Sequence, residues 1–119
     1  MRERGWFVVT LDLEPRFRPS IVGDLACLPV RGQFDLVWAS PPCTEFSRES
    51  MPWCRTGKVP SLELVHAARR VIADVAPAWW VIENVRGATK YLNPLMGEPA
   101  SHGPFFLWGQ FPALRCRVK

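Results

Sequence analysis

Two short apolar segments on either side of an amphipathic one constrain the fold of this chain most. Residues 34–39 (FDLVWA) are rich in aromatic and aliphatic side chains, and they stop at 40–42 (SPP), where two consecutive prolines remove two ladder donors. Residues 79–82 (WWVI) predict a second buried strand, which stops at Glu83-Asn84. Strand, helix and strand in this span are typical of a βαβ unit. We therefore expect an α/β fold with a mostly parallel sheet.

The segment between these strands has helical spacing. Ser61 is the expected N-cap, and Glu63 lies favourably in the first turn, while Pro77 ends the helix. The expected buried face consists of Leu64, Ala68, Val71, Ile72 and Val75.

The rest of the chain predicts shorter elements. Residues 6–11 indicate a strand that stops at Asp12, and Ile21-Val22 indicates another. Beyond Gly87 the pattern weakens, and it allows a short helix within 88–101, an apolar segment at 105–108 and a last strand at 114–118. We expect Phe105, Phe106 and Trp108 to pack in the core, with stacking on nucleic-acid bases as the alternative.

Composition limits the protein class. With 119 residues and 48% hydrophobic residues, the chain predicts a single domain, 1–119, with a buried core. We expect a cytoplasmic protein, because no apolar run reaches the ~18 residues of a membrane span and no signal peptide is visible. The net charge of +4 permits a polyanionic partner. No CxxC pair is present, so we expect neither a zinc site nor a disulfide framework.

Reactive or acidic residues follow three of the predicted strands. These are Asp12, Cys43 and Glu83, and the carboxyl ends of parallel strands meet at one edge of a sheet. Cys43 and Glu83 follow strands joined by one helix, so we expect the two strands to be neighbours. A thiol beside a carboxylic acid indicates covalent catalysis with acid assistance. The alternatives are a structural thiol at Cys43, a capping or ion-paired carboxylate at Glu83, and a strand-ending cap at Asp12.

Two motifs resemble those of the DNA (cytosine-5) methyltransferases. Pro42-Cys43 followed by Phe46-Ser47 is similar to the family's P-C-Q-x-F-S loop, and Glu83-Asn84-Val85 matches its E-N-V motif. The resemblance implies a Rossmann-like core that uses S-adenosylmethionine. It also implies that Cys43 adds to C6 of a flipped cytosine in DNA. Glu83, protonated or hydrogen-bonded at N3 and the exocyclic amine, then stabilises the charge displaced into the ring.

Further site residues follow from the same resemblance. Asp12 is similar to the acidic residue that holds the cofactor ribose, Asp24 to the residue near the adenine, and Pro42 to a residue that borders the cofactor. Arg115 and Arg117 resemble the family's Q-x-R-x-R strand, whose arginines help to hold the target base, with Ala113 at the glutamine position.

A second motif interpretation competes with this one. Residues 40–42 also open the S-P-P-Y loop of the amino methyltransferases, in which an aromatic ring stacks on the base. Here Cys43 occupies the aromatic position, and with Glu83 this favours C5 of cytosine over an exocyclic nitrogen.

The resemblance also indicates what this sequence lacks. The family's first strand and glycine-rich cofactor loop precede the equivalent of Trp6, and no target-recognition region is present. We expect a different strand order, a complementing chain or a strand swapped within a homo-oligomer to fill the gap. The alternative function is an inactive or split methyltransferase that acts as an oligomeric module binding DNA or a partner.

Overall fold

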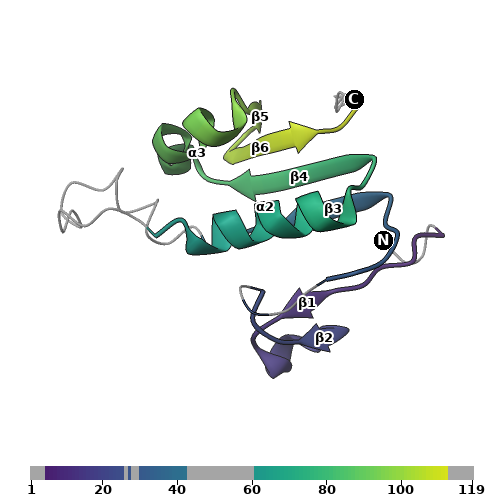
Figure 1. Cartoon of the computed structure of the whole chain (residues 1–119). Coiled ribbons are helices and arrows are strands. Elements are labelled where there is room, and N and C mark those ends of the chain that lie inside the picture. The colour runs from purple at the N-terminus through teal and green to yellow at the C-terminus, as the bar shows by residue number, and fades with distance from the viewer. Residues whose placement is uncertain (1–4, 26, 28–29, 43–60, 113–119) are drawn as a thin grey trace, which may run out of the picture.

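A sheet with four strands forms the centre of the molecule. The computed structural model describes residues 5–25, 27, 30–42 and 61–112. The strand order in this sheet is β3-β4-β6-β5 (Figure 1). Their bounds are Leu36–Ala39 for β3, Trp79–Asn84 for β4, Ala100–His102 for β5 and Phe105–Gln110 for β6. Together with the two helices described below, this sheet confirms the α/β class.

The direction of the strands corrects the prediction of a mostly parallel sheet. β3 and β4 are parallel, but β6 runs antiparallel both to β4 and to β5, so the sheet is mixed. The short connection through Gly103 explains the reversal, because only antiparallel strands can be joined by a tight turn. β5 consequently points in the same direction as β3 and β4, with β6 inserted between β4 and β5.

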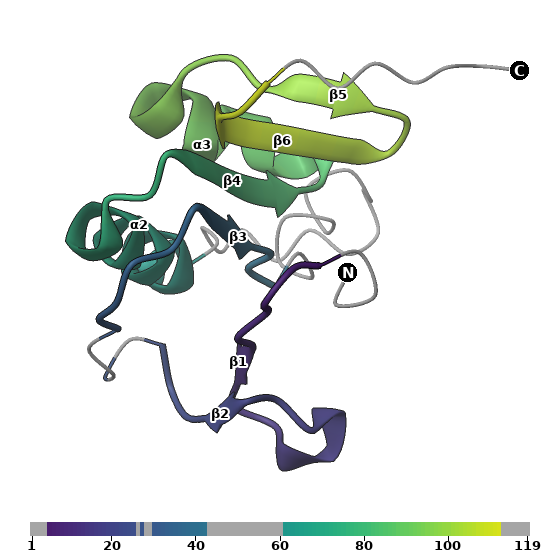
Figure 2. The same cartoon turned by 90° about the vertical axis from the view of Figure 1, so that its right-hand side faces the viewer.

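Two helices cover one face of this sheet. α2 (Glu63–Val75) and α3 (Thr89–Met96, after the 3-10 turn η4, Arg86–Ala88) lie on the same side of the strands (Figure 2). Val65, Leu92 and Trp108 form the centre of the core with Ala88. The indole Nε1 of Trp108 donates to Oδ1 of Asn93 at 2.9 Å, so its polar group is satisfied inside the core.

The register of α2 differs from the prediction. The helix begins at Glu63 with Leu62 as N-cap, although the Oγ of Ser61 accepts a hydrogen bond from the Glu63 amide at 3.3 Å. Leu64 is 38% exposed, which contradicts its predicted place on the buried face. The buried positions of the helix are Val65, Ala67, Ala68 and Val71. The sheet selects this stripe because Val65 packs in the cluster with Trp108.

The strand predicted at 6–11 is wrong in extent. Only Leu11 of that segment is in β1 (Leu11–Asp12), which pairs in parallel with β2 (Ile21–Val22). One residue earlier, the hydroxyl of Thr10 accepts from the Ser20 amide at 2.8 Å, and the Thr10 amide donates to the Ser20 hydroxyl at 3.1 Å. These side chains satisfy the backbone groups that a longer ladder would use. The connection between β1 and β2 holds the 3-10 turn η2 (Pro15–Phe17).

Strand β4 is longer than predicted, and its pairing depends on a glycine. Glu83 and Asn84 belong to the strand, where Glu83 pairs with Leu107. Gly109 on β6 has φ +147°, and a Cβ there would collide with the backbone carbonyl of Trp80. Only glycine allows β6 to approach β4 this closely.

The last predicted strand, 114–118, lies outside the described residues. Among the residues that the structure describes, no helix is long and apolar enough to cross a bilayer.

Candidate functional site

The ends of β3 and β4 lie side by side, and a buried asparagine joins them. Asn84 is 1% exposed; its Nδ2 donates to the carbonyl of Pro41 at 3.2 Å, and its Oδ1 accepts from the Val85 amide at 2.9 Å. The segment that leads to Cys43 is thereby held against the strand that carries Glu83. In the sequence, Asn84 stands out only as part of the E-N-V motif. The available signal was an asparagine inside an apolar strand, where the residue type is disfavoured.

An open pocket lies beside these strand ends. It has a volume of about 410 Å³ and is lined by Trp38, Ser40, Glu83, His102, Phe105 and Leu107. Its size falls within the ~300–1,000 Å³ of ordinary ligand pockets. The Nε1 of Trp38 donates to the hydroxyl of Ser40 at 3.0 Å, which ties one aromatic wall to the end of β3.

The strand register places these side chains on one face. Trp38 is opposite Val81, two residues before Glu83, and Glu83 is opposite Leu107. Side chains two residues apart on a strand share a face. Trp108 is one residue beyond Leu107 and packs against the helices, so the pocket lies on the other face of the sheet.

The pocket combines aromatic rings with one carboxylate. Trp38 and Phe105 supply flat apolar surfaces, and Glu83 supplies a hydrogen-bond acceptor among them. Such a lining suits a planar heterocycle that carries an N–H donor on its edge. The role of Glu83 at a bound ligand stays a prediction.

Three predicted residues lie outside the described part of the chain. They are Cys43, which follows Pro42 directly in the sequence, and Arg115 and Arg117. Pro42 itself belongs to the segment that Asn84 anchors through Pro41. The catalytic roles of Cys43, Arg115 and Arg117 stay predictions.

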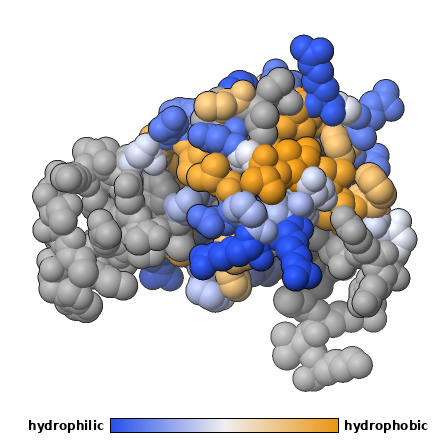
Figure 3. Space-filling view, turned by 90° about the horizontal axis from the view of Figure 1, so that it is seen from below, coloured by the Kyte–Doolittle hydropathy of each residue, from blue (hydrophilic) through white to orange (hydrophobic). Residues whose placement is uncertain are grey.

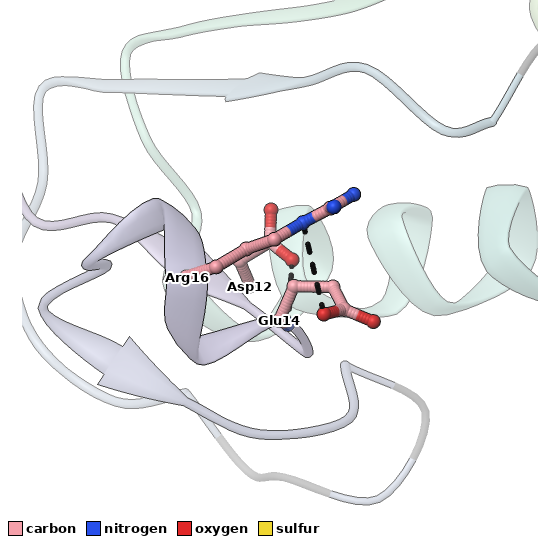
Figure 4. Close-up of polar contacts among 3 residues, drawn as sticks. All are labelled: Asp12, Glu14 and Arg16. Carbon is pink, nitrogen blue, oxygen red and sulfur yellow. Dashed lines mark hydrogen bonds and ion pairs between the residues drawn. The ribbon is translucent and has the colours of Figure 1, made fainter.

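The two predicted cofactor carboxylates occur together, but away from this sheet. Asp12 ends β1, and Asp24 lies two residues beyond β2, its parallel partner. Oδ1 of Asp12 accepts from the Glu14 amide at 2.9 Å, and Glu14 forms an exposed ion pair with Arg16 at 3.9 Å (Figure 4). Oδ2 of Asp24 accepts from the thiol of Cys27 at 3.9 Å.

The predicted meeting of Asp12 with Glu83 at one sheet edge is therefore wrong. β1 pairs with β2 in a sheet of its own, and both views show this pair below β3 and α2 (Figures 1 and 2). The sequence pattern misled because a strand end shows the local direction of the chain but not the sheet that the strand joins.

Within the described ranges, no group of three or more His, Cys, Asp or Glu residues could hold a metal ion. Comparisons with models of protein families, with characterised proteins and with solved structures find no match to this chain.

Proposed function

We propose that this chain is a DNA (cytosine-5) methyltransferase-like protein with a Rossmann-like core. The observation that carries the proposal is the hydrogen bond from Asn84 to the Pro41 carbonyl. It joins the segment before Cys43 to the strand of Glu83, and these are the two motifs that resemble the family. The pocket supports the same function. It is lined by Ser40, which lies between β3 and the Pro42-Cys43 motif, and by Glu83 of the E-N-V motif.

The proposed chemistry uses two groups, the thiol of Cys43 and the carboxyl group of Glu83. The Cys43 thiolate forms a bond to C6 of cytosine, which breaks the aromaticity of the ring and makes C5 nucleophilic. Glu83 accepts a hydrogen bond from the exocyclic N4 amine and thereby holds the base. Once C5 carries the transferred methyl group, C5 loses its proton to water, the electrons of the C6–S bond return to sulfur, and the thiolate is regenerated. Arg115 and Arg117 would help to hold the base.

S-adenosylmethionine is the proposed methyl donor, and it supplies an electrophilic methyl group. Asp12 and Asp24 fit its ribose end because a half-buried and an exposed carboxylate lie at the same end of neighbouring parallel strands, where hydroxyl groups can donate to them. Pro42 would border it.

A trapping experiment tests the proposal. We expect an oligonucleotide with 5-fluorocytosine to form a stable adduct with Cys43 when S-adenosylmethionine is supplied, because fluorine on C5 cannot leave as a proton. Intact-mass spectrometry followed by peptide mapping detects the adduct. Cys43→Ser should abolish it, whereas Cys27→Ser, at an exposed cysteine whose replacement keeps a hydroxyl donor for Asp24, should leave it unchanged. An unmodified wild-type protein would contradict the proposal.

The second candidate is an inactive or split methyltransferase that acts as an oligomeric binding module. It is favoured by the separation of β1 and β2 from the sheet, and by β3, which pairs only with β4 among the described strands. Analytical ultracentrifugation tests it: a concentration-dependent dimer without a 5-fluorocytosine adduct supports the module, and an adduct formed by a monomer contradicts it.

A further inference from the structure

A serine hydroxyl lies beside the carboxyl group of Glu83 at the edge of the pocket. The last pair of the β3–β4 ladder comes directly before Ser40 and Glu83, so these two residues are opposite each other. The hydrogen bond from Asn84 to the Pro41 carbonyl continues the same register one residue further. Both side chains line the pocket, so a ligand between the strand ends meets a hydroxyl and a carboxyl group together.

An indole orients the hydroxyl of Ser40. Nε1 of Trp38 donates to Oγ of Ser40 at 3.0 Å. An indole N–H can only donate, so this bond occupies a lone pair of the serine oxygen and leaves the hydroxyl proton to be donated elsewhere. A hydroxyl that already accepts one hydrogen bond is polarised by it and becomes a better donor. Ser40 therefore offers a hydrogen-bond donor to the pocket.

The carboxyl group of Glu83 is the matching acceptor. Glu83 is half-buried, and within the described part of the chain its carboxyl group forms no hydrogen bond or ion pair. Phe105 and Leu107 bring no polar side-chain atoms to the pocket, and His102 lies on β5, which β6 separates from β4. No lysine or arginine is among the described lining residues, so the neutral edge of a base fits better than a phosphate.

We propose that Ser40 determines which base the pocket accepts, by donating its hydroxyl proton to ring N3 of cytosine while Glu83 accepts from the N4 amine. Cytosine has an acceptor at N3 beside a donor at N4. Uracil and thymine have a donor at N3 beside an acceptor at O4, which would oppose the Glu83 carboxylate and leave both groups unpaired. This assigns N3 to Ser40 and the amine to Glu83.

The two parts of this inference have different foundations. The choice of cytosine as the ligand rests on the proposed function. The donor at Ser40 beside the acceptor at Glu83 rests on the strand register and on the bond from Trp38. The experiment therefore uses free nucleosides, whose binding does not depend on Cys43 or on S-adenosylmethionine.

NMR titration of the backbone amide signals measures the Kd of the whole chain for deoxycytidine and for deoxyuridine. We expect the wild-type protein to prefer deoxycytidine. Ser40→Ala should weaken deoxycytidine binding roughly tenfold, the effect of one lost hydrogen bond, and change deoxyuridine binding by less than about twofold. Ser101→Ala is the matched control, because Ser101 is an exposed serine that pairs with Phe106 on the other face of the sheet, and it should change neither Kd.

Trp38→Phe tests how the hydroxyl is held. It keeps an aromatic ring and removes the indole N–H, so we expect the preference for deoxycytidine to fall, but less than in Ser40→Ala. No binding of deoxycytidine, an unchanged preference in Ser40→Ala, or an equal loss in Ser101→Ala would overturn the inference.

The 5-fluorocytosine experiment separates this inference from the proposed function. A preference for deoxycytidine that depends on Ser40, in a wild-type protein that forms no adduct, would support the role of Ser40 and contradict the catalytic proposal. An adduct that forms equally fast in the wild-type protein and in Ser40→Ala would support the catalytic proposal and overturn the role of Ser40.

Discussion

The sheet region and the N-terminal region of this chain are built differently. Among the described residues, every buried side chain lies between Val65 and Trp108, and none lies within 5–25. The N-terminal region exposes apolar side chains instead. From below, the side on which β1 and β2 lie, a hydrophobic area appears bordered by hydrophilic side chains (Figure 3). The exposed apolar residues of the β1–β2 pair and its connection are Leu13, Phe17, Ile21 and Val22.

The residues that stabilise the fold and the residues proposed to bind the cofactor ribose therefore lie in different regions of the molecule. Burial of apolar surface is the main favourable term in folding, so the sheet region carries most of the stability. The proposed ribose residues, Asp12 and Asp24, lie in the region that buries least. Segments with few buried contacts open locally at low free energy, and binding sites are often drawn from them. A ligand held by Asp12 and Asp24 would therefore also order the segment that carries them.

Truncating the indole of Trp108 in the core tests this comparison and should have the largest effect on stability. We expect Trp108→Ala to lower the free energy of unfolding by about 3–5 kcal/mol, because it leaves a cavity among Val65, Ala88 and Leu92. Phe17→Ala in the N-terminal region should change it by less than about 0.5 kcal/mol, because the ring is largely exposed. Urea denaturation measures both. Similar losses for the two variants would show that the N-terminal region is part of the same core.

The fold was predictable in segments whose structure depends mainly on their own local sequence. The helix that ends before Pro77 and the apolar part of β4 at 79–82 follow from local spacing, whereas the N-cap of the helix and the last two residues of β4 do not. The direction of β6 was not predictable, because it depends on a turn at Gly103 in a segment with weak patterning. The exposure of Phe105 beside the burial of Trp108 was also missed: the sequence shows alternation, but only the placement of the helices decides which face they cover.

Removing the side chain of Asn84, which joins the ends of β3 and β4, should have an intermediate effect on stability. Asn84→Ala removes the hydrogen bonds to Pro41 and Val85 and leaves two partly buried backbone groups, the Pro41 carbonyl and the Val85 amide, without these partners, so the protein should lose about 1–3 kcal/mol of stability. The rate of adduct formation with 5-fluorocytosine should also fall at least tenfold, because the segment before Cys43 is no longer held. Stability is measured in urea and adduct formation by mass spectrometry.

Asn93→Ala is the control for that variant. It removes one hydrogen bond from the indole of Trp108 and should give a comparable loss of stability without slowing the adduct. Equal rates for the two variants would show that Asn84 acts only on stability.

The candidate site was predictable as a set of motifs, but its arrangement was not. Glu83 and the segment before Cys43 were expected together, and the neighbouring strands β3 and β4 bring them together. Asp12 was expected with them because its strand also stops at an acidic residue. Its strand instead pairs with β2, next to the hydrogen bonds between Thr10 and Ser20, and no spacing in the sequence encodes that choice of partner.

The smallest effect concerns a hydrogen bond that joins the two regions. Nη2 of Arg70 on α2 donates to the carbonyl of Leu25 at 2.8 Å. Because this bond is exposed, we expect Arg70→Ala to reduce global stability by at most about 1 kcal/mol. Amide hydrogen exchange should nevertheless accelerate at Ile21 and Gly23, whose amides donate to the carbonyls of Thr10 and Asp12, and not in β4. Arg69→Ala on the same helix is the control. If exchange in β4 rose as much as at Ile21, the two regions would unfold together. They would then differ in how much they bury, but they would not open independently.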